Sequence, residues 1–164
     1  MFNQPNLLER VFYFITELGG PAVIVLTFLA TSFFLWRNHK DLLKCYVSLF
    51  LASEAVVYLL KFLINKPRPL GAILYGETGG SMPSGHAAAA IFIYGFICYL
   101  ISAFYYDLYH RKIVTLILVL LIVAIGLSRL YLDVHYLSDV AAGYLVGGSF
   151  LWLLISQVNS RKNS

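Results

Sequence analysis

Five runs of apolar residues divide the chain, each close to the length of a helix that crosses a bilayer. The runs cover about residues 21–36, 42–64, 85–106, 113–131 and 140–158. Because the hydrocarbon core of a membrane needs about 20 residues of helix, each run is a candidate span. The pattern predicts an all-α fold. We expect a polytopic membrane helix bundle of about five transmembrane helices, in a single membrane-embedded domain over residues 1–164.

Residues 6–18 have a different pattern, with apolar side chains on only one face of the expected helix. Its apolar positions recur at helical spacing: Leu7, Leu8, Val11, Phe12, Ile15 and Leu18. This pattern predicts an amphipathic helix that lies in the membrane interface. The following Gly19-Gly20-Pro21 should bend or break the chain before the first span. One alternative stays open, a single long tilted helix that continues into that span.

The composition narrows the class of protein. Of 164 residues, 60% are hydrophobic and 12% are charged, against about 25% charged in soluble domains. A soluble domain of this size has too much surface to hide that apolar fraction, and disordered chains have the opposite composition. The net charge of +4 is modest. Because loop placement explains most of it, we expect the bilayer and no nucleic acid as the partner.

The basic residues predict how the bundle is oriented. They cluster in the first connection, the third connection and the C-terminal end: Arg37, Lys40, Lys44, Arg111, Lys112, Arg161 and Lys162. The positive-inside rule places these segments on the cytoplasmic side. With five spans, the N-terminus is then outside and the C-terminus is cytoplasmic. The connections at 65–84 and 132–139 face outward together.

Four basic residues lie on the outer side against this rule: Lys61, Lys66, Arg68 and Arg129. Charged residues in or beside a membrane span are functional candidates. Lys61, Arg68 and Arg129, hereafter the anion clamp, suit a group with two or three negative charges, because arginine matches phosphate oxygens bidentately. For Lys66, an interfacial position and a substrate contact are both open.

Further polar residues of the same outward segments complete a candidate reaction site. Ser84 and Gly85 open the third span, so the hydroxyl and unpaired backbone N–H groups there add donors. His135 and Asp139 are four residues apart, which on a helix places them on one face. Asp139 can then hold one ring nitrogen and leave the other lone pair for attack, while His86 gives a proton to a leaving oxygen. No ligand-type cluster favours a metal or a cofactor.

Three blocks carry a resemblance to a known family. They are Lys-x6-Arg-Pro from Lys61, Pro-Ser-Gly-His from Pro83 and Ser-Arg-x5-His-x3-Asp from Ser128. Together, and in this order, they resemble the signature of the type 2 phosphatidic acid phosphatase family. That family comprises membrane lipid phosphatases together with soluble vanadium haloperoxidases and acid phosphatases. The resemblance covers residues 61–139.

This resemblance implies metal-independent phosphoryl transfer through a phosphohistidine. His135 would be the nucleophile, Asp139 would orient it, and His86 would protonate the leaving group and then activate water. The phosphate-binding residues would be Lys61, Arg68, Ser84, Gly85 and Arg129. Such a clamp stabilises the charge that develops on the phosphoryl oxygens. Many membrane members have six spans, so five spans and a flat helix depart from the family pattern.

Three acidic residues are not explained by the blocks. Glu54 lies within the second span, seven residues before Lys61 and therefore on nearly the same helix face. It is either a protonated or hydrogen-bonded carboxyl within the bundle, or a contact beneath the site that reaches Lys61 through Tyr58 or water. Glu77 and Asp133 face outward, where either one would repel or position a substrate.

We therefore expect a multi-pass lipid phosphatase of the plasma (inner) membrane with its active site facing outside. Its substrate would be a membrane lipid phosphate, with four candidates: undecaprenyl diphosphate, phosphatidylglycerol phosphate, phosphatidate and lipid A 1-phosphate. Two alternatives stay open. One is a lipid-to-lipid phosphotransferase, and the other is a non-catalytic protein that binds or transports lipid phosphates. The sequence leaves the oligomeric state unknown.

Overall fold

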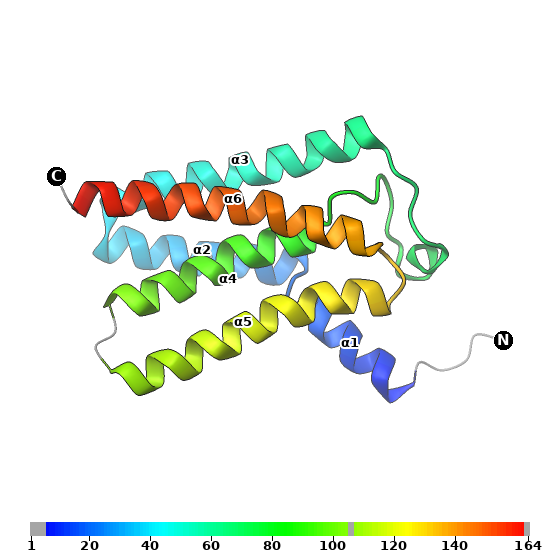
Figure 1. Cartoon of the computed structure of the whole chain (residues 1–164), viewed down its shortest axis with the longest axis horizontal. Helices are drawn as coiled ribbons and strands as arrows, with labels where there is room; N and C mark the ends of the chain where they lie inside the picture. The colour runs from blue at the N-terminus through cyan, green and yellow to red at the C-terminus, as the bar shows by residue number, and fades with distance from the viewer. Residues whose placement is uncertain (1–5, 105–106, 163–164) are drawn as a thin grey trace.

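A computed structural model describes residues 6–104 and 107–162 of the chain, with side chains through residue 160. All regular elements of these residues are helical (Figure 1). They are α1 (Leu7–Glu17), α2 (Pro21–Asn38), α3 (Lys40–Ile64), the 3-10 helix η1 (Leu70–Tyr75), α4 (Gly85–Phe104), α5 (Leu108–Tyr131) and α6 (Leu137–Lys162). Five segments are long and apolar enough to cross a membrane. The predicted all-helical membrane bundle is confirmed.

The chain breaks between α1 and α2, so the alternative of one continuous helix is wrong. Asn6 starts α1 with a capping box, in which its side chain accepts from the Glu9 N–H and the Glu9 carboxylate accepts from the Asn6 N–H. The helix ends at Glu17, and α2 begins after Gly20 with Pro21 in its first turn. Helix α1 packs against α5 (Figure 1). Its location in the membrane interface stays a prediction.

Helix α4 is the centre of the bundle and packs against α2, α3, α5 and α6. Its small residues Ala87–Ala90 are all buried. Facing them, Gly143 and Gly147 of α6 lie so close to the Ser84 and Ala88 carbonyls that a Cβ at either glycine would clash. Small residues on both helices therefore allow a close approach, as they do in many membrane bundles.

Several helices extend beyond the apolar runs that predicted them. Helix α5 starts at Leu108, because the Asp107 carboxylate caps it by accepting from the Tyr109 and His110 N–H groups. Helix α6 includes polar residues at both ends, from Leu137 to Lys162. The predicted end of the third span, Tyr106, lies outside the described residues, as do the side chains of Arg161 and Lys162.

The two connections rich in polar residues lie at the same end of the bundle. One runs from Asn65 through η1 to Ser84, and the other joins α5 to α6 over residues 132–136 (Figure 1). The Gly71 N–H donates to the Asp133 carboxylate over 3.1 Å and ties the two connections together. The helix ends at the α2–α3 and α4–α5 junctions, which carry Arg37, Lys40, Arg111 and Lys112, are at the opposite end. We call the end with the polar connections the loop end.

Candidate active site

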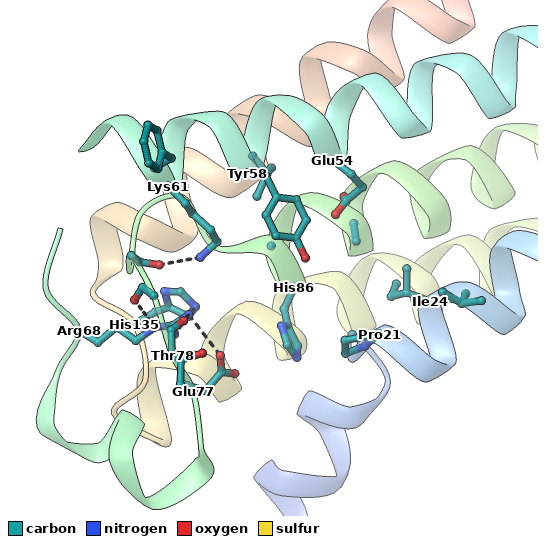
Figure 2. Close-up of a pocket in the computed structure, with 18 of the residues that line it drawn as sticks. Pro21, Ile24, Glu54, Tyr58, Lys61, Arg68, Glu77, Thr78, His86 and His135 are labelled. Atoms are coloured by element: carbon teal, nitrogen blue, oxygen red, sulfur yellow. Dashed lines mark hydrogen bonds and ion pairs between the residues drawn. The ribbon is translucent and has the colours of Figure 1, made fainter. Parts of the chain in front are cut away.

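A cavity of about 800 Å³ opens at the loop end, where α2, α3 and α4 meet the 65–84 connection (Figure 2). Its lining includes eight residues that the sequence singled out: Glu54, Tyr58, Lys61, Arg68, Glu77, Gly85, His86 and His135. Ser84, Arg129 and Asp139 are buried behind this lining. The fold thus brings together three separate stretches of chain around one hollow.

Arg68 is fixed against the α5–α6 connection by several hydrogen bonds. Its Nη1 donates to the Val134 carbonyl over 3.2 Å and lies 3.3 Å from His135 Nε2. Its Nε donates to the Gly79 carbonyl, and its Nη2 forms an ion pair with Glu77 Oε2 over 3.2 Å. The guanidinium therefore lies directly beside the nitrogen expected to attack.

Arg129, near the C-terminal end of α5, is only 3% exposed. Its Nη1 donates to Thr16 Oγ1 over 2.8 Å and lies 3.5 Å from His86 Nε2. Its Nη2 donates to Glu77 Oε1, while its buried Nε has no partner. Because Thr16 belongs to α1, the N-terminal helix takes part in holding this arginine.

Lys61 reaches the same cavity from the last turn of α3. Its Nζ donates to the Gly80 carbonyl over 2.9 Å (Figure 2). The two segments are in close contact, because a Cβ on Gly80 would lie 2.6 Å from the Lys61 carbonyl oxygen. The three members of the anion clamp therefore come together, as the topology predicted.

His135 lies in the connection before α6, so His135 and Asp139 do not share a helix face as the spacing suggested. The helix begins at Leu137, and Asp139 is in its first turn. The two side chains still meet, with Nδ1 and Oδ2 3.6 Å apart. The reason is a tight turn in which the His135 N–H donates to the Arg129 carbonyl over 3.3 Å.

Asp139 is completely buried and accepts hydrogen bonds at both carboxylate oxygens. Oδ1 pairs with Lys66 Nζ over 2.6 Å. Oδ2 accepts from the Tyr136 N–H over 2.9 Å and from the Ser81 hydroxyl. Ser81 Oγ also lies 3.4 Å from His135 Nδ1. A carboxylate with this many donors is held in its charged form, and Lys66 is thereby assigned a contact within the site.

The environment of His135 keeps its ring neutral. Burial lowers the pKa of His135 first, and the nearby charges of Arg68, Arg129 and Lys61 act in the same direction. Asp139 opposes them, and the net result is a pKa of about 3. Nδ1 faces the carboxylate of Asp139, which favours the proton on that nitrogen. Nε2 is then the unprotonated nitrogen, and it lies 3.3 Å from Arg68 Nη1.

Glu77, which the sequence left without a role, lies between the two arginines. Burial alone would raise the pKa of the Glu77 carboxyl, but the charges of Arg129 and Arg68 outweigh this and hold the pKa below its usual value. The carboxylate is therefore ionised at neutral pH, at the position where the anion clamp would receive a ligand.

The start of α4 places Ser84, Gly85 and His86 in sequence. The Ser84 hydroxyl accepts from the Ala87 N–H over 3.5 Å, and the Ser84 N–H donates to the Asp139 carbonyl over 2.8 Å. Ser84 thus caps α4 and joins it to α6. Gly85 and His86 line the cavity. The N-terminal end of α4, with its partial positive charge, faces the site.

Glu54 and Tyr58 project from α3 into the more apolar part of the cavity (Figure 2). Glu54 Oε1 is buried and has no hydrogen-bond partner. Tyr58 is 72% exposed. A contact between Glu54 and Lys61 through Tyr58 or water stays a prediction.

Two residues of the site were missed in the sequence. Ser81 lies two positions before Pro83, and no partner at a recognisable spacing marked it. Thr16 is not one of the apolar positions of the amphipathic helix, and its contact with Arg129 joins residues 113 positions apart. Among the described residues, no group of three or more His, Cys, Asp or Glu side chains gathers as a metal site would require.

Comparison with known proteins gives a consistent set of relatives. The family model described as the PAP2 superfamily matches residues 42–163. Phosphatidylglycerophosphatase B of Bacillus subtilis is 32% identical over 150 residues, which cover 90% of this chain and 73% of that protein. Lipid A 4'-phosphatase of Bacteroides thetaiotaomicron is 28% identical over 158 residues, 86% of this chain and 67% of that protein.

Two crystal structures are similar over most of the chain. The first is the transmembrane PAP2 type phosphatidylglycerolphosphate phosphatase from Bacillus subtilis, with a TM-score of 0.80 and 30% identity, covering 96% of this chain and 80% of that one. The second is LpxE of Aquifex aeolicus, with a TM-score of 0.66 and 25% identity, covering 94% and 88% of the two chains.

Proposed function

The chain belongs to the PAP2 superfamily and is a membrane lipid phosphate phosphatase, and from this premise we propose that it works through a phosphohistidine formed on His135. The observation that carries the proposal is the position of His135 Nε2, which lies 3.3 Å from Arg68 Nη1 at the edge of the cavity, in surroundings that lower the pKa of the ring. An unprotonated nitrogen beside a phosphate-binding cation is what in-line attack on phosphorus requires.

In the first step, the Nε2 lone pair of His135 attacks the terminal phosphorus. The bond between phosphorus and the lipid oxygen breaks and its electron pair goes to that oxygen. His86 supplies the proton, in the protonated form that the negative charge of the bound phosphate favours. Arg68, Arg129 and Lys61 stabilise the charge on the phosphoryl oxygens, as electrostatic clamps do in other phosphoryl transfers. Asp139 stabilises the positive charge that His135 acquires.

In the second step, water attacks the phosphorus of the phosphohistidine. The now neutral His86 accepts the proton from this water, and the phosphorus–nitrogen bond breaks. Inorganic phosphate leaves and His135 returns to its neutral form. No metal takes part in this scheme, because the cations that stabilise charge are side chains of the protein.

The walls of the cavity support a lipid substrate whose chains stay in the bilayer. Beyond the polar residues, the lining is apolar and belongs to α2, α3 and α4: Pro21, Ile24, Val25, Phe50, Val57, Phe62 and Ala89. We propose phosphatidylglycerol phosphate as the first candidate substrate, because the names of two similar proteins refer to it. Lipid A 1-phosphate, phosphatidate and undecaprenyl diphosphate are the further candidates.

The charge distribution supports an active site on the outer face of the plasma membrane. The basic residues Arg37, Lys40, Arg111 and Lys112 lie at or near the connections opposite the loop end. By the positive-inside rule that end is cytoplasmic, so the cavity faces outside.

The test is phosphate release in detergent with EDTA present, across the four lipid candidates, for the wild type, His135→Ala and His110→Ala. His110 is an exposed histidine near the start of α5 and serves as the matched control. We expect release from one or more lipids that resists EDTA, is lost in His135→Ala by at least about 10³-fold and persists in His110→Ala. Equal release from His135→Ala would refute the phosphohistidine. Phosphate that appears only on a second lipid would indicate transfer instead of hydrolysis.

A further inference from the structure

The anion clamp of this structure is already occupied by a side chain of the protein. Glu77 Oε2 pairs with Arg68 Nη2 over 3.2 Å (Figure 2). Glu77 Oε1 accepts from Arg129 Nη2. The carboxylate therefore bridges the two arginines that should bind the substrate. A phosphoryl group placed in line with His135 Nε2 needs the same donors, so Glu77 and the substrate compete for them.

The chain around Glu77 allows the carboxylate to leave. Gly76 and Gly79 flank it with φ of +65° and +75°, and a Cβ at either glycine would meet nothing within 4 Å. The Glu77 backbone is held by its N–H bond to the Ala72 carbonyl over 3.1 Å. The side chain is 24% exposed and has its arginine contacts only at the carboxylate. Rotation about its side-chain bonds is therefore enough to clear the clamp while the backbone stays in place.

We infer that Glu77 is a specificity-determining residue, whose carboxylate competes for Arg68 and Arg129 so that doubly charged terminal phosphates bind and singly charged phosphodiesters do not. The inference rests on the proposed function, because it concerns which phosphate reaches His135.

The physical reason is a comparison of charges. A phosphodiester carries one negative charge, the same as Glu77, but the glutamate is tethered beside the clamp at a high effective concentration. A terminal phosphate carries about −1.5 to −2 at pH 7 and has three acceptor oxygens. It can pair with both arginines and also with Lys61. While Glu77 occupies the arginines, Lys61 Nζ donates to the Gly80 carbonyl instead. Only the second ligand gains enough to displace the carboxylate.

This competition matters because phosphodiester lipids form much of the membrane around the cavity. An anion clamp without Glu77 would bind their head groups in the same cavity. The enzyme would then be inhibited by the membrane itself. With Glu77 in place, the resting clamp is neutralised until a more highly charged group arrives.

The experiment measures inhibition by a phosphodiester lipid in mixed micelles of neutral detergent. Phosphatidylglycerol phosphate is the substrate, phosphatidylmethanol is the singly charged competitor, and phosphatidylcholine replaces it in the dilution control. We expect Glu77→Gln to bind the competitor about tenfold more tightly than the wild type does, which corresponds to about 1.4 kcal/mol. The KM for the substrate should fall as well. Asp133→Asn removes an acidic charge from the same loop end without touching the arginines, and it should keep the wild-type inhibition constant.

A binding measurement separates this inference from the proposed reaction. In the His135→Ala background, thermal unfolding is followed with inorganic phosphate and with dimethyl phosphate, with and without Glu77→Gln. We expect dimethyl phosphate to stabilise only the protein that carries the Glu77→Gln substitution, and inorganic phosphate to stabilise both proteins. This result would support the inference even if no lipid were hydrolysed.

Two outcomes would overturn it. One is an unchanged inhibition constant together with a lower kcat in Glu77→Gln, which would make Glu77 a residue that only orients the arginines. The other is a wild type already inhibited by phosphatidylmethanol as strongly as the variant. If Glu77→Gln fails to fold, Glu77→Asp keeps the charge on a shorter side chain, and its inhibition constant should lie between those expected for the wild type and for Glu77→Gln. A Glu77→Asp protein no more sensitive than wild type would equally refute the inference.

Discussion

Two carboxylates lie beside the histidines and cations of this site, and they are held in different ways. Asp139 is in the first turn of α6, is completely buried and receives hydrogen bonds from Lys66, Ser81 and a backbone N–H. Glu77 is on a loop between two glycines with positive φ, and its carboxylate forms ion pairs with Arg68 and Arg129. The first carboxylate is a permanent part of the site, whereas the second occupies a place that the substrate needs.

The difference shows how a protein can use the same functional group for opposite purposes. A carboxylate with several fixed donors in a buried helical turn orients its neighbour and remains charged throughout the reaction. A partly exposed carboxylate on a flexible side chain has interactions that a stronger anion can replace. Local backbone structure, more than chemical identity, separates the two roles.

The largest effect that would sharpen this comparison is expected from Asp139→Asn. The substitution removes the charge that stabilises phosphorylated His135 and leaves Lys66 without the carboxylate of its ion pair. By analogy with other histidine–aspartate pairs, we expect phosphate release to fall by about 10³-fold or more, while Glu77→Gln retains turnover. Asp133→Asn is the matched control. Steady-state kinetics measures the rate, and an intact melting transition shows that the variant is folded. If the rate of phosphate release falls no more than in Glu77→Gln, the two carboxylates do not differ as proposed.

A smaller effect is expected from Ser81→Ala. The hydroxyl bridges Asp139 Oδ2 and His135 Nδ1, whose direct separation is 3.6 Å. Its loss should loosen the orientation of the ring and lower kcat by about tenfold, with little change in KM, in line with the cost of one hydrogen bond to a charged group. Ser138→Ala, which removes a hydroxyl near the other carboxylate oxygen, should cost at most about twofold in kcat. Equal losses in the two variants would contradict a bridging role for Ser81.

The smallest expected effect is on the protonation state of the His135 ring alone. Because its pKa is lowered to about 3, the ring should remain neutral as the pH falls from about 8 to about 5, and its nucleophilic form should persist across this range. Nitrogen NMR of the labelled ring checks this in the free protein. Arg68→Gln removes a positive charge beside Nε2, so it should raise the pKa of His135, whereas Arg111→Gln at the opposite end should leave the spectrum unchanged. If the wild-type ring titrates above about pH 6, the surroundings of His135 do not keep the ring neutral, and this prediction is wrong.

Much of the fold followed from local sequence signals. The apolar runs predicted helices near the right places because a bilayer requires a nearly fixed length of apolar helix. The break after α1 followed from Gly19-Gly20-Pro21. The start of α5 at Leu108 was five residues earlier than the apolar run suggested, because the Asp107 cap stabilises a turn that hydrophobicity does not mark.

The site was predicted only where its residues fall in recognisable blocks. Lys61, Arg68, His86, Arg129 and His135 were found in this way, and charge placement alone put their segments at one end of the bundle. The assumption that His135 and Asp139 share a helix face was wrong, because spacing does not reveal where a helix begins. The neighbours Thr16, Ser81 and Glu77 depend on contacts between distant segments.

The sequence by itself determined the class of this protein, its helices and the residues that we propose for phosphoryl chemistry, because hydrophobic length, charge asymmetry and side-chain type are properties of the chain. The tertiary structure decided which side chain meets which. It placed Thr16 against Arg129, Ser81 between His135 and Asp139, and the Glu77 carboxylate across the two arginines. Such contacts join groups that are far apart in the chain, and only the packing of the helices and the path of the loops can fix them.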